Sequence, residues 1–329
     1  MFKTILIGFG KIAAGYANDP IMNRFIEYST HIKVLKDHPN FDLTTVVDKD
    51  EKSIQEAKDI WGIEEVLDDI NKLENPGEFE IAVIAIPPKG RFEIIKKLTN
   101  LKAIILEKPI AENVNEAKKI IEICKVRNIL VQVNFLRRFD EKIILNLKNF
   151  HQHVGDLQAA FGLYGNGLKN NGSHLIDWAR MFLGEVNWVQ TIAEGKSLDD
   201  GPINNDLNVP FLLGFKNDNV LMVQKLEFKF YREILLDFWG EKGRLLFTQE
   251  GLISSNLRTA KHRYSHNDFE ISSDKQDFKL MDQSHAMYNL YSNLSDAIFS
   301  NAVLRSDINN AFIVMKIINN IEKSFLKND

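Results

Sequence analysis

The chain is poor in cysteine and has no long apolar run. Cys124 is the one cysteine among 329 residues, which excludes an intramolecular disulfide and favours a reducing, cytoplasmic compartment. The apolar runs, such as Ile81–Ile86, are the size of a strand and well short of the ~20 residues of a membrane span. The first of them, Thr4–Gly8, is too short for the core of a signal peptide. We therefore expect neither a membrane span nor a secretory signal.

The chain also lacks an excess of positive charge. It has 41 Lys and Arg against 45 Asp and Glu, a net charge of −4, which argues against a nucleic-acid partner. No solenoid repeat and no low-complexity tract is found in the sequence. With 44% hydrophobic and 26% charged residues, the composition is that of a globular protein. Its length is about twice the ~150-residue prior for one domain, so two domains are expected.

Strand and helix patterns alternate in the first part of the chain. Short runs rich in Ile, Val and Leu predict buried parallel strands at Phe2–Ile7, Leu43–Val47, Ile81–Ile86, Ala103–Leu106 and Ile129–Val133. Helical patterns separate several of them, at Ser53–Trp61, Arg91–Leu98 and Asn115–Arg127. This alternation indicates an α/β Rossmann domain, which we assign to residues 1–122.

The pattern changes in the second part, residues 123–329. Strands are predicted at Leu157–Tyr164, Val186–Glu194, Val209–Lys216, Asn219–Lys229, Glu233–Trp239 and Arg244–Thr248, with one helix among them at Leu175–Leu183. This predicts an α+β domain with a large, mostly antiparallel open sheet. Two helices are expected to follow, Ser284–Phe299 and Asp307–Phe325, and the last is expected to pack back on the first domain.

A dinucleotide-binding motif follows the first predicted strand. Gly8 permits a tight turn, Gly10 lets the backbone approach a pyrophosphate, and Lys11, Ile12 and Ala13 open a predicted helix. Ala13 would keep that helix close to the strand. The alternative is a glycine turn without a ligand.

Asp48 ends the second predicted strand and is a candidate ligand of the adenosine ribose. A carboxylate there favours NAD over NADP, although the nearby Lys49 and Lys52 keep NADP open. The spacing from the glycines exceeds the usual ~20 residues. The surplus is expected in Asn18–Thr30, where Asp19-Pro20 should interrupt the first helix. Alternatively, Asp48 only caps a turn or helix.

Two further turns follow predicted strands at the edge where α/β sheets bind ligands. Pro87 lies after the third strand and Glu107-Lys108-Pro109 after the fourth. Lys108 could hydrogen-bond a substrate hydroxyl and stabilise developing negative charge. The alternative is a solvated turn.

In the second part, the segment Asn170–Asp177 leads into the predicted helix. His174 is suited to take a proton from an alcohol, and Asn170 and Asp177 could orient its ring or bind substrate. The alternative is that Asn171 or Ser173 caps the helix and His174 has no catalytic role.

Together these motifs resemble the glucose-fructose oxidoreductase/inositol dehydrogenase (Gfo/Idh/MocA) family. They occur in order along nearly the whole chain: G-F-G-K-I-A at 8–13, V-V-D at 46–48, I-P-P at 86–88, E-K-P at 107–109, N-F-L-R-R-F at 134–139 and N-N-G-S-H-L-I-D at 170–177. The resemblance implies a Rossmann domain and a sheet domain whose open face makes a homodimer or homotetramer. It also implies NAD(P)-dependent oxidation of a sugar, polyol or nucleotide-sugar hydroxyl.

The resemblance also implies residue roles. Lys108 would be the substrate-binding and proton-relay lysine, His174 the general base and Asp177 a substrate-side carboxylate. The nicotinamide end of the cofactor site would include Pro87, Glu107, Lys108 and Pro109, and Tyr164 joins the candidate substrate-binding residues. Two departures from the family pattern matter. Asn170 stands where many relatives carry an aspartate. The Asn-x-Gly-x-His pattern at 170–174 is similar to that of relatives acting on nucleotide sugars for surface polysaccharide, which favours such a substrate. Arg91 stands where relatives often have a histidine, and it could pair with a carboxylate or phosphate of the substrate or with the cofactor.

The sequence thus predicts an NAD-dependent cytoplasmic dehydrogenase acting on a CH–OH group. No metal is expected, because His151 and His153 have no third ligand cluster nearby in the sequence. The alternative is a non-catalytic sensor or regulator of the same fold that binds the dinucleotide. The sugar, the hydroxyl and the direction of the reaction are not determined by the sequence.

Overall fold

The chain divides into two compact units, which we describe separately. The computed structural model describes residues 1–192, 196–198, 202–264, 267–280 and 283–328. Unit 1 contains residues 1–140 and 283–312, and unit 2 contains residues 141–282 and 313–329. The expected boundary at residue 122 instead falls inside helix α4 (Val114–Val126). The division lies later because strand β6 (Leu130–Val133) pairs with β5 (Ala103–Leu106) and completes the first sheet.

Unit 1 is built on a parallel sheet of six strands in the order β3-β2-β1-β4-β5-β6. Besides β5 and β6, the strands are β1 (Phe2–Ile7), β2 (Phe41–Val47), β3 (Glu65–Leu67) and β4 (Ile81–Ile84). All five predicted strands are present, which confirms the Rossmann prediction. Only β3 was missed, because three residues of intermediate burial carry no readable pattern.

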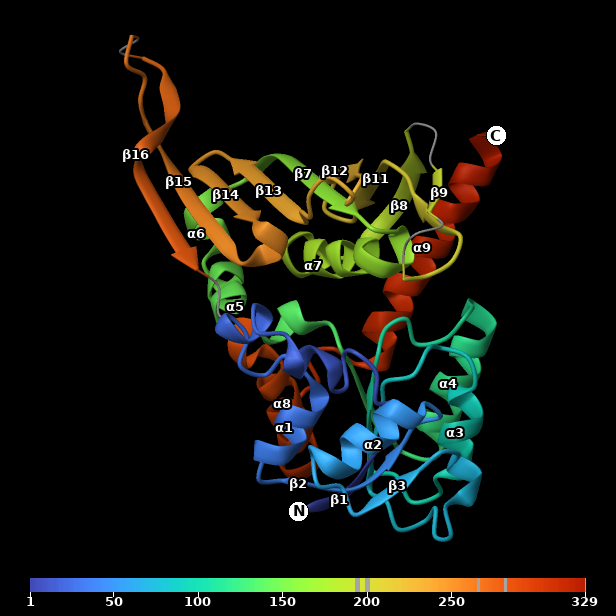
Figure 1. Ribbon diagram of the computed structural model, residues 1–329. Coiled ribbons are helices and arrows are strands. Elements are labelled where there is room, and N and C mark those ends of the chain that lie inside the picture. The colour runs from blue at the N-terminus through green and yellow to red at the C-terminus, as the bar shows by residue number, and fades with distance from the viewer. Residues whose placement is uncertain (193–195, 199–201, 265–266, 281–282, 329) are drawn as a thin grey trace. The chain divides into compact units, whose positions relative to one another are not determined.

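Helices cover both faces of this sheet (Figure 1). They are α1 (His31–Asp37), α2 (Glu51–Asp59), α3 (Arg91–Lys97), α4 and α8 (Ala286–Ser300). Helices α1 and α8 contact each other, and so do α3 and α4. Apolar side chains of α1, α8 and the sheet, such as Ile32, Leu290 and Val83, share one buried core. The segment 283–312 therefore belongs to the Rossmann unit although it follows the second sheet in sequence.

The segment after the glycine motif differs from the prediction. Instead of an α-helix, the chain forms a turn closed by hydrogen bonds from the Ala14 and Gly15 N–H groups to the Gly10 carbonyl. Two short 3-10 helices follow, Gly15–Asn18 and Met22–Arg24, and α1 begins only at His31. The surplus spacing before Asp48 thus lies where it was expected. The helix is lost rather than merely interrupted, so no α-helix dipole follows the motif.

Unit 2 is built on a sheet of eight strands in the order β16-β15-β14-β13-β7-β12-β11-β8. The strands are β7 (Leu157–Gly165), β8 (Val186–Thr191), β11 (Phe211–Phe215), β12 (Val220–Leu226), β13 (Leu235–Gly240), β14 (Gly243–Thr248), β15 (Ile253–Lys261) and β16 (Phe269–Leu280). All pairs are antiparallel except β7 with β12. This confirms the predicted mostly antiparallel sheet, whereas β15 and β16 were missed. Part of the predicted strand Val186–Glu194 lies outside the described residues.

Helix α7 (Ser173–Leu183) packs on one face of this sheet and contacts β7 and β13. The indole of Trp178 lies 4.9 Å from the ring of Phe247, and both side chains are fully buried. The opposite face exposes large apolar side chains, among them Phe161, Trp188 and Met222. The remaining strands and helices of unit 2 are short: β9 (Lys196–Leu198), β10 (Asp206–Asn208), α5 (Glu141–Lys148) and α6 (Phe150–Val154).

The C-terminal helix belongs to the first unit only at its start, so the expectation that it packs back there is met for a few residues and not for the rest. Helix α9 (Ile308–Asn328) leaves unit 1 after residue 312, and its remainder belongs to unit 2. There Lys169 pairs with Glu322 at 2.7 Å, and the Thr191 N–H donates to the Ser324 hydroxyl at 3.1 Å. The helix that packs on the first sheet is instead α8. In the described part of the chain, no helix is long and apolar enough to cross a membrane.

Candidate active site

A cavity of about 510 Å³ opens beside the glycine motif, at the carboxyl ends of the parallel strands. Residues from four strand ends line it, namely Ile7, Gly8, Gly10, Val47, Asp48, Lys49, Asp68, Asp69, Ile70, Ala85, Ile86, Pro87, Lys89 and Ile94. Gly8, Gly10, Asp48 and Pro87 were predicted to bind cofactor. Asp68, Asp69 and Ile70 were missed, because the three-residue strand before them was not recognised.

The glycines fit a dinucleotide at this cavity. Gly8 has φ +91°, and a Cβ there would lie 2.9 Å from the Ala85 carbonyl carbon, so only glycine is accommodated. A Cβ at Gly10 would meet nothing within 4 Å, so the backbone is open to a close ligand. Ala13 is fully buried, as its predicted packing role requires, whereas Lys11 is exposed and Ile12 half-buried. Backbone N–H groups of this turn, rather than a helix dipole, are available to the phosphates.

Asp48 both lines the cavity and supports the turn. Its Oδ2 accepts a hydrogen bond from the Phe9 N–H at 2.5 Å, and its Oδ1 accepts one from the Asp50 N–H at 2.8 Å. Each carboxylate oxygen retains a second lone pair for a ribose hydroxyl. The turn-cap alternative is thus partly correct, since Asp48 caps a turn, but the helix α2 is capped by Asp50. Capping and ribose binding are compatible at this residue.

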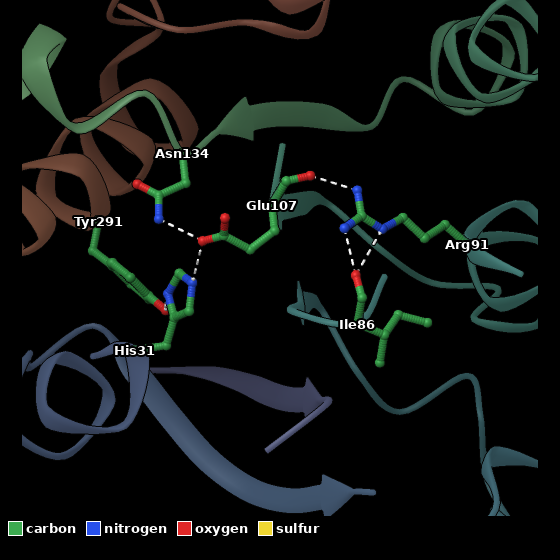
Figure 2. Close-up of polar contacts among 6 residues, drawn as sticks. All are labelled: His31, Ile86, Arg91, Glu107, Asn134 and Tyr291. Carbon is green, nitrogen blue, oxygen red and sulfur yellow. Dashed lines mark hydrogen bonds and ion pairs between the residues drawn. The ribbon is translucent and has the colours of Figure 1, made fainter. Parts of the chain in front are cut away.

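The turn Glu107-Lys108-Pro109 follows β5 at the same edge of the sheet, and the Lys108-Pro109 bond is cis. Figure 2 shows the Glu107 carboxylate between two side chains from distant segments. Its Oε1 lies 3.0 Å from His31 Nε2 and accepts a hydrogen bond from the Asn134 amide at 2.5 Å. The second ring nitrogen of His31 lies 2.9 Å from the Tyr291 hydroxyl. We call His31, Glu107, Asn134 and Tyr291 the Glu107 cluster.

The Glu107 cluster holds its carboxyl group ionised. Burial alone would raise the pKa of Glu107, but the hydrogen bonds from His31 and Asn134 and the charge of Lys108 bring it below its ordinary value. Burial and the Glu107 charge raise the pKa of Tyr291 well above 10, so its hydroxyl keeps its proton. Sequence reasoning missed His31 and Tyr291, since each is an isolated polar residue in an otherwise ordinary helix. Asn134 begins the motif N-F-L-R-R-F, to which no role was assigned.

Arg91 does not have the role predicted for it. Its side chain is buried, and its guanidinium donates to the backbone carbonyls of Ile86, Glu107 and Pro109 (Figure 2 shows the first two). Burial lowers the pKa of Arg91 to about 10, against the opposing charges of Glu107 and Glu116, so it stays protonated at neutral pH. Because these donors are engaged with carbonyls, Arg91 ties the two strand-end turns together rather than pairing with a substrate anion.

In unit 2, a buried carboxylate holds the segment that leads to His174. Asp206 accepts hydrogen bonds from the N–H groups of Lys169 at 2.9 Å and Asn170 at 3.0 Å. These residues lie in the π-helical turn Leu168–Gly172, which continues directly into α7. His174 is the second residue of α7 and is partly exposed. Asp206 was missed because its strand, β10, has only three residues.

The capping alternative for this segment is wrong. No side chain caps the start of α7, and the Ser173 hydroxyl donates to the Asn170 carbonyl at 2.7 Å. The Asn170 side-chain amide donates to the Asn166 carbonyl at 3.2 Å, which orients it within the turn. The segment is therefore shaped by Asp206 and by internal hydrogen bonds, and His174 is presented at its end.

Two predicted substrate ligands lie in the interior of unit 2. Tyr164 is fully buried, and its hydroxyl donates to the Val209 carbonyl at 2.8 Å and accepts from the Val209 N–H at 3.0 Å. Since both functions of the hydroxyl are used, we assign Tyr164 to the core, which corrects the prediction. Asp177 is 1% exposed, with its Oδ1 3.8 Å from Arg180 Nη1. Its substrate role stays a prediction.

Cys124 and the possible metal ligands are the other candidate centres. Cys124 is buried in α4, and burial raises the pKa of its thiol to about 11, which makes it unreactive. Within the described residues, no group of three or more His, Cys, Asp or Glu side chains could hold a metal ion.

Comparison with known proteins agrees with this geometry. Residues 2–135 match the model of an oxidoreductase family with an NAD-binding Rossmann fold. The match covers all six strands of the parallel sheet in unit 1. The matching model is that of the Gfo/Idh/MocA family, which confirms the resemblance of the motifs over residues 2–135.

Curated relatives match only part of the chain. Two uncharacterized oxidoreductases of Schizosaccharomyces pombe are 28% identical over 143 residues and 26% identical over 140 residues. The first match covers 37% of this chain and 37% of the relative, and the second covers 42% and 34%. The matched segments thus span about a third of the length of these relatives.

Solved structures share the fold over the whole chain. Levoglucosan dehydrogenase in complex with NADH and L-sorbose has a TM-score of 0.74 at 19% identity, covering 100% of this chain and 97% of that one. The WlbA dehydrogenase from Bordetella pertussis, in complex with NADH and UDP-GlcNAcA, has a TM-score of 0.72 at 16% identity with the same coverage. A super-repressor mutant of Gal80p from Saccharomyces cerevisiae has a TM-score of 0.75 at 12% identity, again with this coverage. These likenesses establish the fold of both units.

Proposed function

We propose that the protein is an NAD-dependent dehydrogenase that oxidises a CH–OH group of a sugar, polyol or nucleotide sugar. The observation that carries the proposal is the position of Lys108. It follows β5 at the carboxyl edge of the sheet, the same edge that forms the cavity of Gly8, Gly10 and Asp48. Ligands of open α/β sheets bind at this edge. Lys108 therefore lies on the edge of the sheet at which the cofactor would bind.

The proposed roles follow from the chemistry of each side chain. Bound NAD⁺ supplies the hydride acceptor. Lys108 donates a hydrogen bond to the substrate oxygen and stabilises its developing negative charge. His174 takes the hydroxyl proton, so the carbon loses a hydride and the oxygen loses a proton. Asn170 and Asp177 orient the substrate or the ring of His174.

The substrate class is supported by two features. The folds of a levoglucosan dehydrogenase and of a dehydrogenase crystallised with UDP-GlcNAcA are similar to this one. The Asn-x-Gly-x-His pattern at 170–174 is similar to that of relatives acting on nucleotide sugars for surface polysaccharide. On this basis we propose a cytoplasmic enzyme whose substrate is such a nucleotide sugar. The exposed apolar side chains of the open sheet, including Phe161 and Met222, support assembly into a homodimer or homotetramer. Light scattering on the purified chain tests the assembly.

A screen of free and nucleotide-linked sugars with NAD⁺ and NADP⁺ tests the activity. Lys108→Ala and His174→Ala are each expected to lower turnover by about two to four orders of magnitude, since a proton-transfer group contributes that much. NADH binding, measured by fluorescence, should survive in both. Lys118→Ala and His151→Ala, which remove exposed side chains, are the matched controls. Turnover equal to that of the wild type in both Lys108→Ala and His174→Ala would contradict the proposed mechanism.

The second candidate is a non-catalytic regulator that binds the dinucleotide. It is favoured by the likeness of the fold to a Gal80p repressor mutant. The presence of both Lys108 and His174 argues against it, because a pure binder needs neither. NADH binding without turnover of any sugar in the screen would favour this candidate over the dehydrogenase.

A further inference from the structure

Glu107 directly precedes Lys108 in the chain, and the Glu107 cluster joins four segments that are far apart in the sequence. His31 comes from the first turn of α1, Glu107 from the end of β5, Asn134 from the end of β6 and Tyr291 from α8. His31 and Tyr291 are fully buried, and Asn134 is 3% exposed. Three of these four residues have no part in the mechanism described above. Burying such groups is costly unless every one is hydrogen-bonded.

The hydrogen bonds of the Glu107 cluster have a defined direction. An ionised Glu107 can only accept, so His31 Nε2 and the Asn134 amide donate to its Oε1. The Tyr291 hydroxyl keeps its proton and lies 2.9 Å from His31 Nδ1. Both ring nitrogens of His31 thus have a polar partner, and the carboxylate oxygen is held by two donors.

We propose that His31, Asn134 and Tyr291 are positioning residues that keep Glu107 as a fixed negative charge beside Lys108, and that this charge keeps Lys108 in its ammonium form during turnover. The proposal rests on the proposed function of Lys108 as a hydrogen-bond donor to the substrate oxygen. It assigns a task to Glu107 that does not require contact with the cofactor.

The charged groups around Glu107 come from several elements. Arg91, from α3, donates hydrogen bonds to the backbone carbonyls of Glu107 and Pro109. Glu107 acts on Lys108 and Arg91 with the opposite sign, and Glu116, from α4, acts on Arg91 in the same way. His31 and Tyr291 complete the titratable groups in the cluster.

The direct test is the titration of Lys108 in the full-length protein. Reductive ¹³C-methylation makes each lysine visible by NMR, and Lys108→Arg assigns its signal. Glu107→Gln is expected to lower the pKa of Lys108 by about one unit, the scale of a close partly buried charge. His31→Leu should lower it by less, and His31→Gln, which can still donate to Glu107, should restore most of the shift. Glu80→Gln is the matched control, because Glu80 pairs with Lys102 at the start of β5.

An unchanged titration of Lys108 in Glu107→Gln and His31→Leu would overturn the proposal. If Glu107→Gln does not fold, His31→Leu and Tyr291→Phe carry the same test, because they weaken the support without removing the carboxylate. In the assay, the alkaline limb of the kcat profile should move to lower pH in step with Lys108. A purely structural cluster would lower kcat equally at every pH and leave that limb in place.

The titration also separates this inference from the proposed function. A chain that turns over no sugar contradicts the dehydrogenase, yet the shift of Lys108 in Glu107→Gln is still measured. Conversely, an active enzyme whose Lys108 titrates independently of Glu107 retains the proposed function and contradicts the inference.

Discussion

Two buried carboxylates, one in each unit, support the two candidate catalytic side chains in different ways. Glu107 in unit 1 is held by the side chains of His31 and Asn134, through one of its oxygens. Asp206 in unit 2 is held by the backbone N–H groups of Lys169 and Asn170, one on each oxygen. The first carboxylate precedes Lys108 in the chain, and the second anchors the turn that leads to His174.

Their opposite pKa shifts show what each arrangement does. Burial tends to raise the pKa of both, and for Asp206 burial prevails over its two backbone donors and over Lys169. For Glu107 the hydrogen bond and charge of His31, with Asn134 and Lys108, outweigh burial and lower the pKa. The surroundings of Glu107 therefore stabilise its negative charge. Asp206 instead fixes the position of the backbone by accepting hydrogen bonds from two N–H groups.

The largest expected effect breaks the anchor in unit 2. Gly167 has φ +96°, and a Cβ there would lie 2.0 Å from Asp206 Oδ2. Gly167→Ala should lower the free energy of unfolding by about 3 kcal/mol or more, since it combines a strained φ with a clash against a fixed carboxylate. Gly184→Ala is the control, with φ +85° and nothing within 4 Å, so it introduces the backbone strain without the clash and should cost about 1–3 kcal/mol. Equal losses in urea unfolding would contradict a fixed Asp206.

Removing each charge compares the two supports directly. Asp206→Asn leaves one backbone N–H facing an NH₂ group, because Asp206 uses both oxygens, and should cost about 1–3 kcal/mol. Glu107→Gln can keep both donors on its single remaining carbonyl oxygen and should cost about 1 kcal/mol. Urea unfolding of both variants measures the difference. If Glu107→Gln lost more free energy of unfolding than Asp206→Asn, Asp206 would not be the stronger structural support.

The two buried tyrosines extend the comparison. Tyr164→Phe removes a hydroxyl that both donates to and accepts from Val209, and should cost about 1–2 kcal/mol without changing kcat. Tyr291→Phe removes one hydrogen bond to His31 and should cost about 1 kcal/mol or less, but it should alter the kcat profile with pH. Thermal unfolding and pH-dependent turnover separate these outcomes. A loss of substrate affinity in Tyr164→Phe would restore its predicted role as a substrate ligand.

The smallest effect is the pH dependence of stability, which should have opposite signs in the two units. Glu107 has a lowered pKa in the folded state. The stability that it contributes is present above about pH 4.5 and is lost as the pH falls through this folded-state pKa. Asp206 has a raised pKa in the folded state. The stability that it contributes is complete below about pH 3.8 and is lost as the pH rises through this folded-state pKa. In acid, the Tm advantage of wild type over Glu107→Gln should shrink, and its advantage over Asp206→Asn should grow. Parallel changes would show that the two carboxylates do not differ.

Much of the Rossmann sheet could be predicted, because its strands are continuous buried runs that leave a strong local pattern. The strands β3 and β10 could not be predicted, because each has only three residues. Asp68 and Asp69, which follow β3, and Asp206, which begins β10, were therefore missed as well. The hairpin of β15 and β16 was also missed, since its inner strand buries polar residues such as Ser254 and Asn256. Hydrophobic periodicity cannot identify a strand whose buried side chains are polar.

The sequence by itself determined the resemblance to a family, the NAD-binding motif and the order of the candidate residues, because glycines, strand-end carboxylates and Glu-Lys-Pro are local signals. Only the tertiary structure decided which polar residues support them. The fold brings α1, β6 and α8 together around Glu107, so that His31, Asn134 and Tyr291 form one cluster with it. It also places Arg91 and Tyr164 where their side chains hydrogen-bond to backbone groups. The physical reason is that a hydrogen-bond partner is chosen by proximity in the fold, which the spacing of residues along the chain does not encode.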